Sequence, residues 1–373
     1  MRYLDFAATT PIDKEALQVY MEVAQSFYGN THSLHDIGSK AAQLLENCRL
    51  TLANILNVPK EGIHFTTGGT EANQLALFTF AWSIKDGKNH MITTKGEHSS
   101  IRSTFPLLER LGVEITELSL TSTGEIDLKQ LENEIRPSTF LVATHHVNGE
   151  TGVVQPIDEL KKILAPHDIW LHVDCVQSFG KLPLSSIVSN VDSLSISSHK
   201  IYGPKGVGAL YIRPNLYIHA LFAQTPSDNR LRGGTVDLPS IAAFVYAAKK
   251  AESNQQAYYA LGERLRKVFL NKLTSPSIRI IQHHEAVKQL PHVIGCIIDG
   301  MEGSYVMLEA NRHQFAISTG SACQIGMQQP SKTLTSMGIS EEQAKQFIRL
   351  SVGKTTTEQD MIDFASFLHH ICH

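Results

Sequence analysis

Residues 195–208 read SISSHKIYGPKGVG and place Lys200 just after a short strand-like run. In residues 192–197, Leu194 and Ile196 alternate with polar residues, which is the pattern of a half-buried strand. Glycine and proline turns follow at residues 203–206, so the lysine can reach into a cleft from a strand end. Lysines that do chemistry at such places form Schiff bases with carbonyl compounds. Taken alone, the motif also describes a solvated loop lysine, which is the commoner case.

A second strand end supplies an acidic partner for this lysine, 26 residues earlier in the chain. Residues 170–177 read WLHVDCVQ, a buried-looking strand that delivers Asp174 at its carboxyl end. Ligands of open α/β sheets bind at the carboxyl ends of the strands. A lysine that holds an aldehyde and an aspartate that keeps a pyridine nitrogen protonated are the two groups that pyridoxal 5′-phosphate requires. Asp174 and Lys200 together therefore predict this cofactor.

Strand-like and helix-like stretches alternate through most of the chain. Strand patterns occur at 62–66, 90–94, 113–118, 139–144, 169–174, 193–197 and 207–212, and helical patterns at 70–85, 99–111, 127–135 and 157–165. This alternation predicts an α/β fold with a mostly parallel, seven-stranded sheet and helices on both faces. A helical region from residue 239 to about residue 273 and strand-like runs at 278–281 and 293–298 predict a smaller α+β lobe.

These patterns predict two domains. We expect a large α/β domain over residues 13–255 and a small α+β domain over residues 256–373, to which residues 1–12 also belong. Another helix is expected from Asp13, an N-cap residue, to Gly29. Cys48 falls in the apolar stripe of a further amphipathic helix and is expected in the core.

Composition limits where in the cell the protein is expected and which classes of partner it can have. The net charge is −3 with no basic block, which argues against nucleic acid as an obligate, direct partner. No apolar run approaches the roughly 18 residues of a membrane span, and the N-terminus has no signal-peptide pattern. The five cysteines are scattered without a C-x-x-C pair, which favours reduced thiols in the cytoplasm over disulfides or zinc. Most of the 18 histidines are expected at the surface or at caps, with no metal site.

Three motifs resemble those of one enzyme family. HVDCVQ (172–177), SSHKIYGPKG (197–206) and STGSAC (318–323) are similar to motifs of the NifS/IscS cysteine desulfurases. The resemblance runs from YLDFAATTP (3–11) to IRLSVG (348–353), nearly end to end. It implies the fold of the type I pyridoxal-phosphate-dependent transferases. The cysteine of the third motif is Cys323.

The phosphate of the cofactor is expected at the turn FTTGGTEAN, residues 65–73. Two glycines after a strand, with Thr70 opening a helix, form an anion site by their free N–H groups, although a plain tight turn has the same pattern. The resemblance implies that Gly69, Thr70, Ser197 and His199 contact the phosphate. It also implies that Thr235, in RLRGGTVD (230–237), reaches the phosphate of a neighbouring subunit in a homodimer.

The cofactor ring has its own candidate contacts. His98, in KGEHSS (95–100), can stack on a flat heteroaromatic ring and move protons, or it can be an exposed turn histidine. The resemblance implies the stacking role for His98. It also implies that Asn148 and Gln177 bind the ring hydroxyl, and Asn148 is a substrate contact as well. Cys175, beside Asp174, points away from the ring by strand alternation and is expected to pack.

Two further residues are candidates for the substrate. Cys323 lies among small residues and glycines in STGSACQIG (318–326), which suits a thiolate nucleophile that moves between substrate and acceptor, or a packing turn. Arg349 lies in the apolar run FIRLSVG (347–353) and needs an anion. An amino-acid carboxylate and an internal carboxylate both satisfy that need.

The resemblance implies a cysteine desulfurase. Such an enzyme converts L-cysteine to L-alanine, with Lys200 taking the Cα proton and Cys323 receiving the sulfur as a persulfide. The sulfur then passes to an acceptor protein, either an iron–sulfur scaffold or a thiolation enzyme. Alternatives are a selenocysteine lyase or aminotransferase of the same fold, or a catalytically silent assembly scaffold. Turnover of 2-oxo acids distinguishes the aminotransferase, and a colourless protein that takes up no cofactor distinguishes the scaffold.

Overall fold

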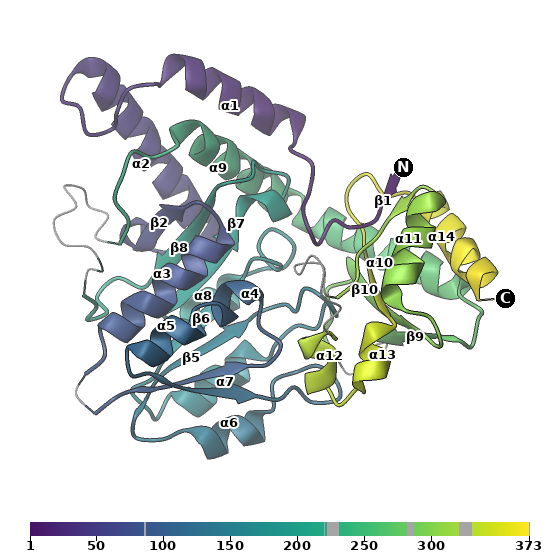
Figure 1. Cartoon of the computed structure of the whole chain (residues 1–373). Coiled ribbons are helices and arrows are strands. Elements are labelled where there is room, and N and C mark those ends of the chain that lie inside the picture. Colours follow the sequence, from purple (N-terminus) through teal and green to yellow (C-terminus); the bar gives the residue numbers. More distant parts are fainter. Residues whose placement is uncertain (86, 220, 222–230, 282–286, 321–329, 373) are drawn as a thin grey trace.

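The computed structural model describes residues 1–85, 87–219, 221, 231–281, 287–320 and 330–372, which form a large and a small lobe (Figure 1). The large lobe is built on a seven-stranded sheet of order β2-β8-β7-β6-β5-β3-β4. Its strands are β2 (Ile63–Thr66), β3 (His90–Thr94), β4 (Glu114–Leu118), β5 (Thr139–His145), β6 (Trp170–Asp174), β7 (Ser193–Ser197) and β8 (Gly208–Ile212). Strand β8 runs antiparallel to β2 and β7 on its two sides, and the other six strands all run in one direction. The predicted mostly parallel sheet is therefore confirmed.

Helices cover both faces of this sheet, as predicted. They are α1 (Lys14–Ser26), α2 (Asp36–Leu56), α3 (Gly69–Trp82), α4 (Ser99–Arg102), α5 (Phe105–Arg110), α6 (Leu128–Glu134), α7 (Ile157–Leu164), α8 (Ser185–Asn190) and α9 (Leu238–Ser253). Successive residues of one strand serve opposite faces. In β5, Leu141 belongs to the apolar cluster that contains residues of α3 and α5, whereas Val142 belongs to the cluster that contains residues of α2, α7 and α9. The sheet is thus buried on both sides, which explains its apolar strands.

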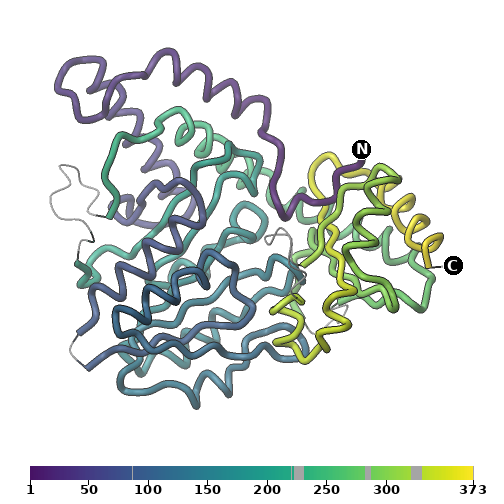
Figure 2. The backbone as a smooth tube through the Cα atoms, in the orientation of Figure 1, coloured from purple at the N-terminus to yellow at the C-terminus, as the bar shows by residue number. Residues whose placement is uncertain are grey.

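The small lobe has its own apolar core around an antiparallel sheet. Its strands β9 (Ile278–Ile281), β10 (Val293–Ile298) and β12 (Phe347–Ser351) pair in the order β12-β10-β9. Five helices accompany them: α10 (Gln255–Lys272), α11 (Gly303–Arg312), α12 (Lys332–Ser336), α13 (Glu341–Lys345) and α14 (Glu358–Ile371). The first strand, β1 (Arg2–Tyr3), pairs with β11 (Phe315–Ala316), so both ends of the chain lie on this lobe (Figure 2).

The structure differs from the predicted elements in four places. The helical region after residue 239 is two helices, because Asn254 leaves helical geometry and caps α9. The helix expected at 99–111 is likewise divided into α4 and α5. The segment around Arg349 was not predicted as a strand, since its apolar run lacks alternation, but it forms the buried strand β12. The helix expected from Asp13 to Gly29 ends earlier, at Ser26.

None of the helices in the described residues combines the length and the apolar character that crossing a membrane requires. Nor do three or more His, Cys, Asp or Glu side chains of the described residues gather in a group that could hold a metal ion. Several histidines are buried rather than at the surface, namely His90, His145, His146, His172 and His292.

Candidate functional site

A cavity of about 360 Å³ brings together ten of the residues that the sequence singled out. These are Gly69, Thr70, His98, Asn148, Asp174, Gln177, Ser197, His199, Lys200 and Arg349. Most lie just after the carboxyl ends of β2, β3, β5, β6 and β7, where ligands of parallel sheets bind. The small lobe adds Arg349 and Gly320, and the N-terminal segment adds Ala7 and Ala8. The cavity therefore needs both lobes.

One end of the cavity is built for an anion. Helix α3 begins at Gly69, and its N-cap residue Gly68 makes no side-chain cap hydrogen bond, so the first N–H groups face outward. A Cβ atom on Gly69 would lie 2.6 Å from Cγ2 of Val176, so only glycine fits this close approach. Ser197 Oγ is buried and has no hydrogen-bond partner among the described residues. This unsatisfied hydroxyl beside the helix start fits a phosphate.

The acid at the end of β6 is buried and hydrogen-bonded. Asp174 Oδ1 accepts a hydrogen bond from the Val176 N–H at 2.8 Å, and Oδ2 accepts one from Asn73 Nδ2 at 2.7 Å. Burial raises the pKa of Asp174, and these two hydrogen bonds oppose the rise. Because hydrogen bonds from neutral donors favour the ionised form, they help to keep the carboxylate available for a protonated ring nitrogen.

Asn73 is a site residue that sequence reasoning missed. It lies one turn after Thr70 in α3, and its Nδ2 donates to Ser100 Oγ at 2.8 Å as well as to Asp174. Ser100 Oγ in turn lies 2.9 Å from His98 Nδ1. One amide thus connects the acid with the candidate stacking histidine. Asn73 lies beside Glu71 and Gln74 at the start of α3, so no signal in the sequence distinguishes it from its polar neighbours.

His98 is held in one orientation by the start of α4. Its side chain caps that helix, with Nδ1 accepting a hydrogen bond from the Ser100 N–H at 3.1 Å. Because Nδ1 accepts, this contact assigns the proton of the neutral ring to Nε2. The histidine lines the cavity, so a proton-bearing nitrogen belongs to the site.

The N-terminal segment holds Lys200. Lys200 Nζ donates hydrogen bonds to the carbonyl oxygens of Ala7 at 2.5 Å and Ala8 at 2.8 Å. Gln177 Nε2 donates to the same Ala7 oxygen at 3.0 Å. Sequence reasoning could not find these contacts, because backbone carbonyls carry no residue-type signal. Burial, followed by the nearby charge of Lys200, lowers the pKa of His199 to about 4, so this histidine is neutral at neutral pH.

Arg349 enters the site from β12 and is already paired. Its Nη2 forms an ion pair with Asp5 Oδ1 at 2.8 Å, and its Nη1 donates to the Gly149 carbonyl oxygen at 3.0 Å. The internal carboxylate that the sequence left open is therefore present. Nε is buried and has no hydrogen-bond partner among the described residues. The ion pair with Asp5 holds the guanidinium at the cavity wall and uses some, but not all, of its N–H donors.

Two sequence candidates do not line this cavity within the described residues. Thr235 is exposed on the loop before α9. Cys323 lies outside the described residues, but Thr319 and Gly320, which precede it, line the cavity. Cys175 packs in the core, as expected, and burial raises the pKa of its thiol.

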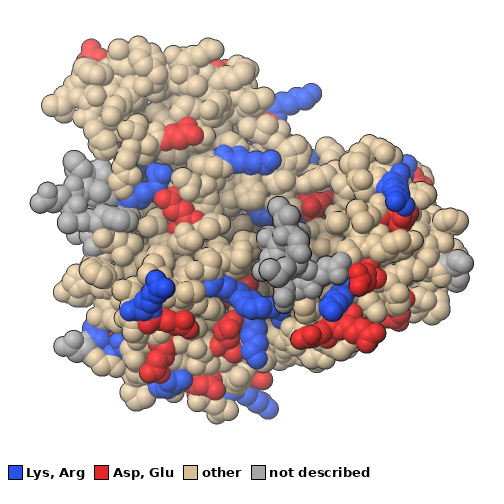
Figure 3. All heavy atoms as spheres, viewed as in Figure 1, with Lys and Arg blue, Asp and Glu red and all other residues tan. Residues whose placement is uncertain are grey.

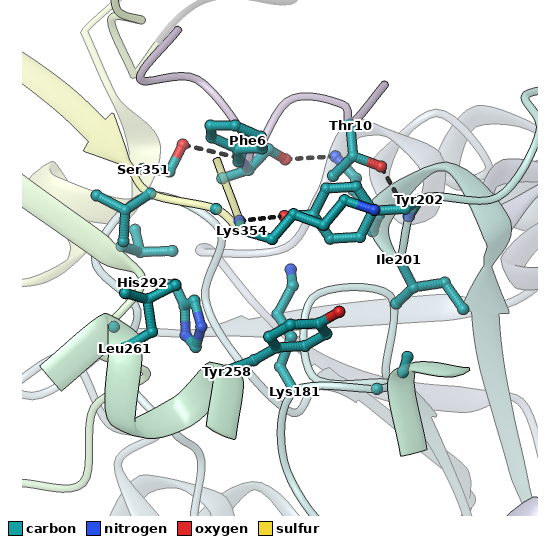
Figure 4. Close-up of a pocket in the computed structure, with 18 residues that line it drawn as sticks. Phe6, Thr10, Lys181, Ile201, Tyr202, Tyr258, Leu261, His292, Ser351 and Lys354 are labelled. Carbon is teal, nitrogen blue, oxygen red and sulfur yellow. Dashed lines mark hydrogen bonds between the residues drawn. The ribbon is translucent and has the colours of Figure 1, made fainter. Parts of the chain in front are cut away.

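A second, smaller cavity of about 40 Å³ lies against Lys200 (Figure 4). It is lined by residues of both lobes, including Lys181, Tyr202, Tyr258, His292 and Lys354. Lys354 lies over the Tyr202 ring, with Nζ 4.3 Å from the ring centre, and also pairs with Asp13 Oδ2 at 2.5 Å. Sequence reasoning did not single out any of these five residues.

Known proteins resemble this chain over nearly its whole length. The family "Aminotransferase class-V" matches residues 2–364. A putative cysteine desulfurase NifS of Bacillus subtilis is 44% identical over 363 residues, covering 97% of this chain and 92% of the relative. A cysteine desulfurase IscS of Dictyoglomus turgidum is 34% identical over 359 residues, covering 96% and 91%. A solved structure described as a NifS-like protein superposes with a TM-score of 0.91 at 30% identity, covering 100% and 99%.

The agreement in sequence and in backbone shape extends across both lobes and therefore across every wall of the cavity. This chain belongs to the class-V aminotransferase family and, within it, to the NifS/IscS cysteine desulfurases, which are pyridoxal-phosphate-dependent enzymes.

Proposed function

We propose that this enzyme transfers the sulfur of L-cysteine to Cys323, leaving L-alanine and a persulfide. The observation that supports the proposal most strongly is the single cavity that holds Lys200, Asp174, His98 and Arg349 together. These groups supply a covalent anchor, an acid for a ring nitrogen, a stacking and proton-carrying ring, and a carboxylate binder. They come from four different segments, so their convergence is a property of the folded chain.

The residues fit pyridoxal 5′-phosphate in chemistry and in placement. We propose that Gly69, Thr70, Ser197 and His199 hold the phosphate, with Thr235 contributed by a second subunit. Asp174 holds the ring nitrogen, His98 stacks on the ring, and Asn148 and Gln177 contact the ring hydroxyl. When bound, the cofactor accepts the electron pair left by the substrate's Cα–H bond.

The steps follow from the side chains. Arg349 binds the substrate carboxylate, and Asn148 gives a second contact. The Lys200 amine takes the Cα proton, and His98 carries a proton at Nε2 within the same cavity. The Cys323 thiolate attacks the substrate sulfur, so an S–S bond forms while the C–S bond breaks. The carbon is reduced to the methyl group of alanine as the sulfur is oxidised, so no external oxidant is required.

We propose a homodimer with shared sites. Thr235 is exposed and does not line its own cavity, which is the arrangement required if it serves a second copy. Near α1 and α2, several large apolar side chains are exposed, namely Leu17, Met21, Tyr28, Leu34 and Ile37. Leu34 is 99% exposed, and the surface over α1 and α2 carries few charges in Figure 3. Exposed apolar patches of this kind mark association surfaces.

Three further proposals concern the domain boundaries, the cellular location and the sulfur acceptor. We propose domains at residues 13–255 and at 256–373 with 1–12, because each lobe has its own apolar core. We also propose a cytoplasmic location, which is supported by four described cysteines that are free thiols. We propose that the acceptor is a protein of iron–sulfur cluster assembly or of thiolation.

Intact mass before and after brief exposure to L-cysteine, followed by peptide mapping, tests the transfer. We expect one added sulfur on the peptide that contains Cys323, removed by a thiol reductant. Cys323→Ser should keep the cofactor absorbance but gain no sulfur, and Lys200→Ala should lose the absorbance of the covalently held cofactor. Added sulfur in the Cys323→Ser protein would remove this cysteine from the mechanism. Turnover of 2-oxo acids without sulfur release would favour an aminotransferase instead.

A further inference from the structure

Lys181 is a partly buried lysine to which the mechanism above gives no role. It lies in the segment after β6, and its Nζ is 3.4 Å from Gln177 Oε1. The other end of this amide, Gln177 Nε2, donates to the Ala7 carbonyl oxygen at 3.0 Å. That same oxygen accepts the hydrogen bond from Lys200 Nζ at 2.5 Å. One side chain and one carbonyl thus connect the two lysines.

The small cavity shows that the two lysines also share an enclosed space. Lys181 and Lys200 both line it, and Figure 4 shows Lys181 between His292 and Tyr258 with its amine directed inward. None of the 18 lining residues is an Asp or a Glu. His292, which is 8% exposed, has a buried Nδ1 without a partner among the described residues. Within this cavity a charge on Lys181 therefore has no carboxylate to compensate it.

The titratable and charged groups that face Lys181 come from every side of the cavity. They are Lys200, Tyr202, Tyr258, His292 and Lys354 in the lining of the cavity, and Arg349, which lies outside that lining but whose charge also acts on Lys181. Lys354 is compensated by its ion pair with Asp13. Burial first, and then the charges of Lys200 and Arg349, lower the pKa of Lys181 to about 7. Because the site is poorly solvated, a positive charge on Lys181 disfavours a positive charge on the Lys200 nitrogen, and the reverse also holds.

We propose that Lys181 is a positioning residue of the desulfurase site, which acts through one hydrogen bond and through its charge; this rests on the function proposed above. Its amine can donate but cannot accept when charged, so it orients Gln177 with Oε1 toward Lys181 and Nε2 toward Ala7. Its positive charge disfavours a proton on the Lys200 nitrogen, and a second cation near a reactive lysine is a known way to activate it. A larger fraction of the Lys200 amine is consequently neutral and available to take the Cα proton.

The pH titration of the bound cofactor's absorbance in the intact holoenzyme tests the electrostatic effect. Lys181→Met removes the charge, so we expect the midpoint to rise by about one pH unit, the order of effect of a nearby like charge. Lys181→Arg keeps the charge, and its midpoint should stay near the wild-type value. Lys354→Met is the matched control, because it removes a lysine from the same cavity whose charge Asp13 already compensates. A midpoint unchanged in Lys181→Met, or shifted equally in Lys354→Met, would overturn the proposal.

Thermal unfolding provides a second test that needs no turnover. A lysine whose pKa is lower in the folded state destabilises it most at pH values below the folded pKa, near 7. This cost declines as the pH rises from there toward the ordinary lysine pKa of about 10.4. Lys181→Met should therefore raise Tm more at pH 6 than at pH 9, relative to wild type. A gain that does not depend on pH would refute an uncompensated charge. If instead the wild-type protein binds cofactor but forms no persulfide, the proposed transfer fails while the Lys181 titration still decides this inference.

Discussion

Replacing Asn73 with alanine tests how the structure keeps Asp174 ionised. The substitution removes the 2.7 Å hydrogen bond to Asp174 Oδ2 and leaves the Val176 N–H as the remaining donor in the described structure. A hydrogen bond to a charged group contributes about 1.5–3 kcal/mol. We therefore expect cofactor affinity to fall roughly 10- to 100-fold, since each 1.4 kcal/mol corresponds to about a factor of ten.

The pH dependence gives the sign of the effect. Burial already raises the pKa of Asp174, and loss of a hydrogen bond that favours the carboxylate raises it further. The carboxylate therefore becomes protonated at a higher pH in Asn73→Ala than in wild type. A protonated Asp174 no longer stabilises a protonated ring nitrogen. As the pH is lowered from 8 to 5, the variant should release cofactor earlier.

The assay follows cofactor absorbance after gel filtration at each pH. Thr79→Val is a matched control, because Thr79 lies in the same helix, is 0% exposed, and has an Oγ1 without a partner among the described residues. It replaces a buried polar group of the same helix that makes no hydrogen bond to Asp174, and it should leave the pH midpoint unchanged. If Asn73→Ala binds the cofactor as tightly as wild type at every pH, the assigned role of the Asn73–Asp174 hydrogen bond is wrong.

Two further predictions concern carboxylates that join distant segments. Glu150 accepts hydrogen bonds from Ser331 Oγ and Thr333 Oγ1, which follow the segment that contains Cys323. Glu150→Gln should slow persulfide formation about tenfold, which corresponds to about 1.4 kcal/mol of activation free energy. Mass spectrometry against time measures this, and an equal loss of cofactor absorbance would argue against a role specific to transfer. Burial acts to raise the pKa of Asp13, but hydrogen bonds from Lys354 and Lys250 outweigh it and lower the pKa from 3.8 to about 2. The ionised carboxylate therefore stabilises the fold above pH 3.8, and this contribution disappears as the pH falls through 2. Asp13→Asn should lower Tm at pH 7, with a gap to wild type that narrows below pH 4; a constant gap would contradict the ion pairs.

Much of the large lobe could be predicted because its signals are local. Each of the seven strands of the main sheet lies within about two residues of its predicted position, since apolar runs between helical patterns identify buried strands. Lys200, Asp174 and His98 each follow such a strand, and strand ends of a parallel sheet meet at one edge. Strand β12 was missed for the converse reason, because a strand buried on both faces shows no alternation.

The sequence by itself determined the alternating fold and the residue types that gather at the strand ends, since both depend on neighbours within a few positions. Only the tertiary structure decided which partners those residues meet. Asn73 contacts Asp174 across 101 positions, Ala7 contacts Lys200 across 193, and Asp5 contacts Arg349 across 344. Such contacts arise from chain topology and close packing, which bring backbone carbonyls and buried amides together without a local pattern. The shared cavity of Lys181 and Lys200 has the same origin, because it exists only where the two lobes meet.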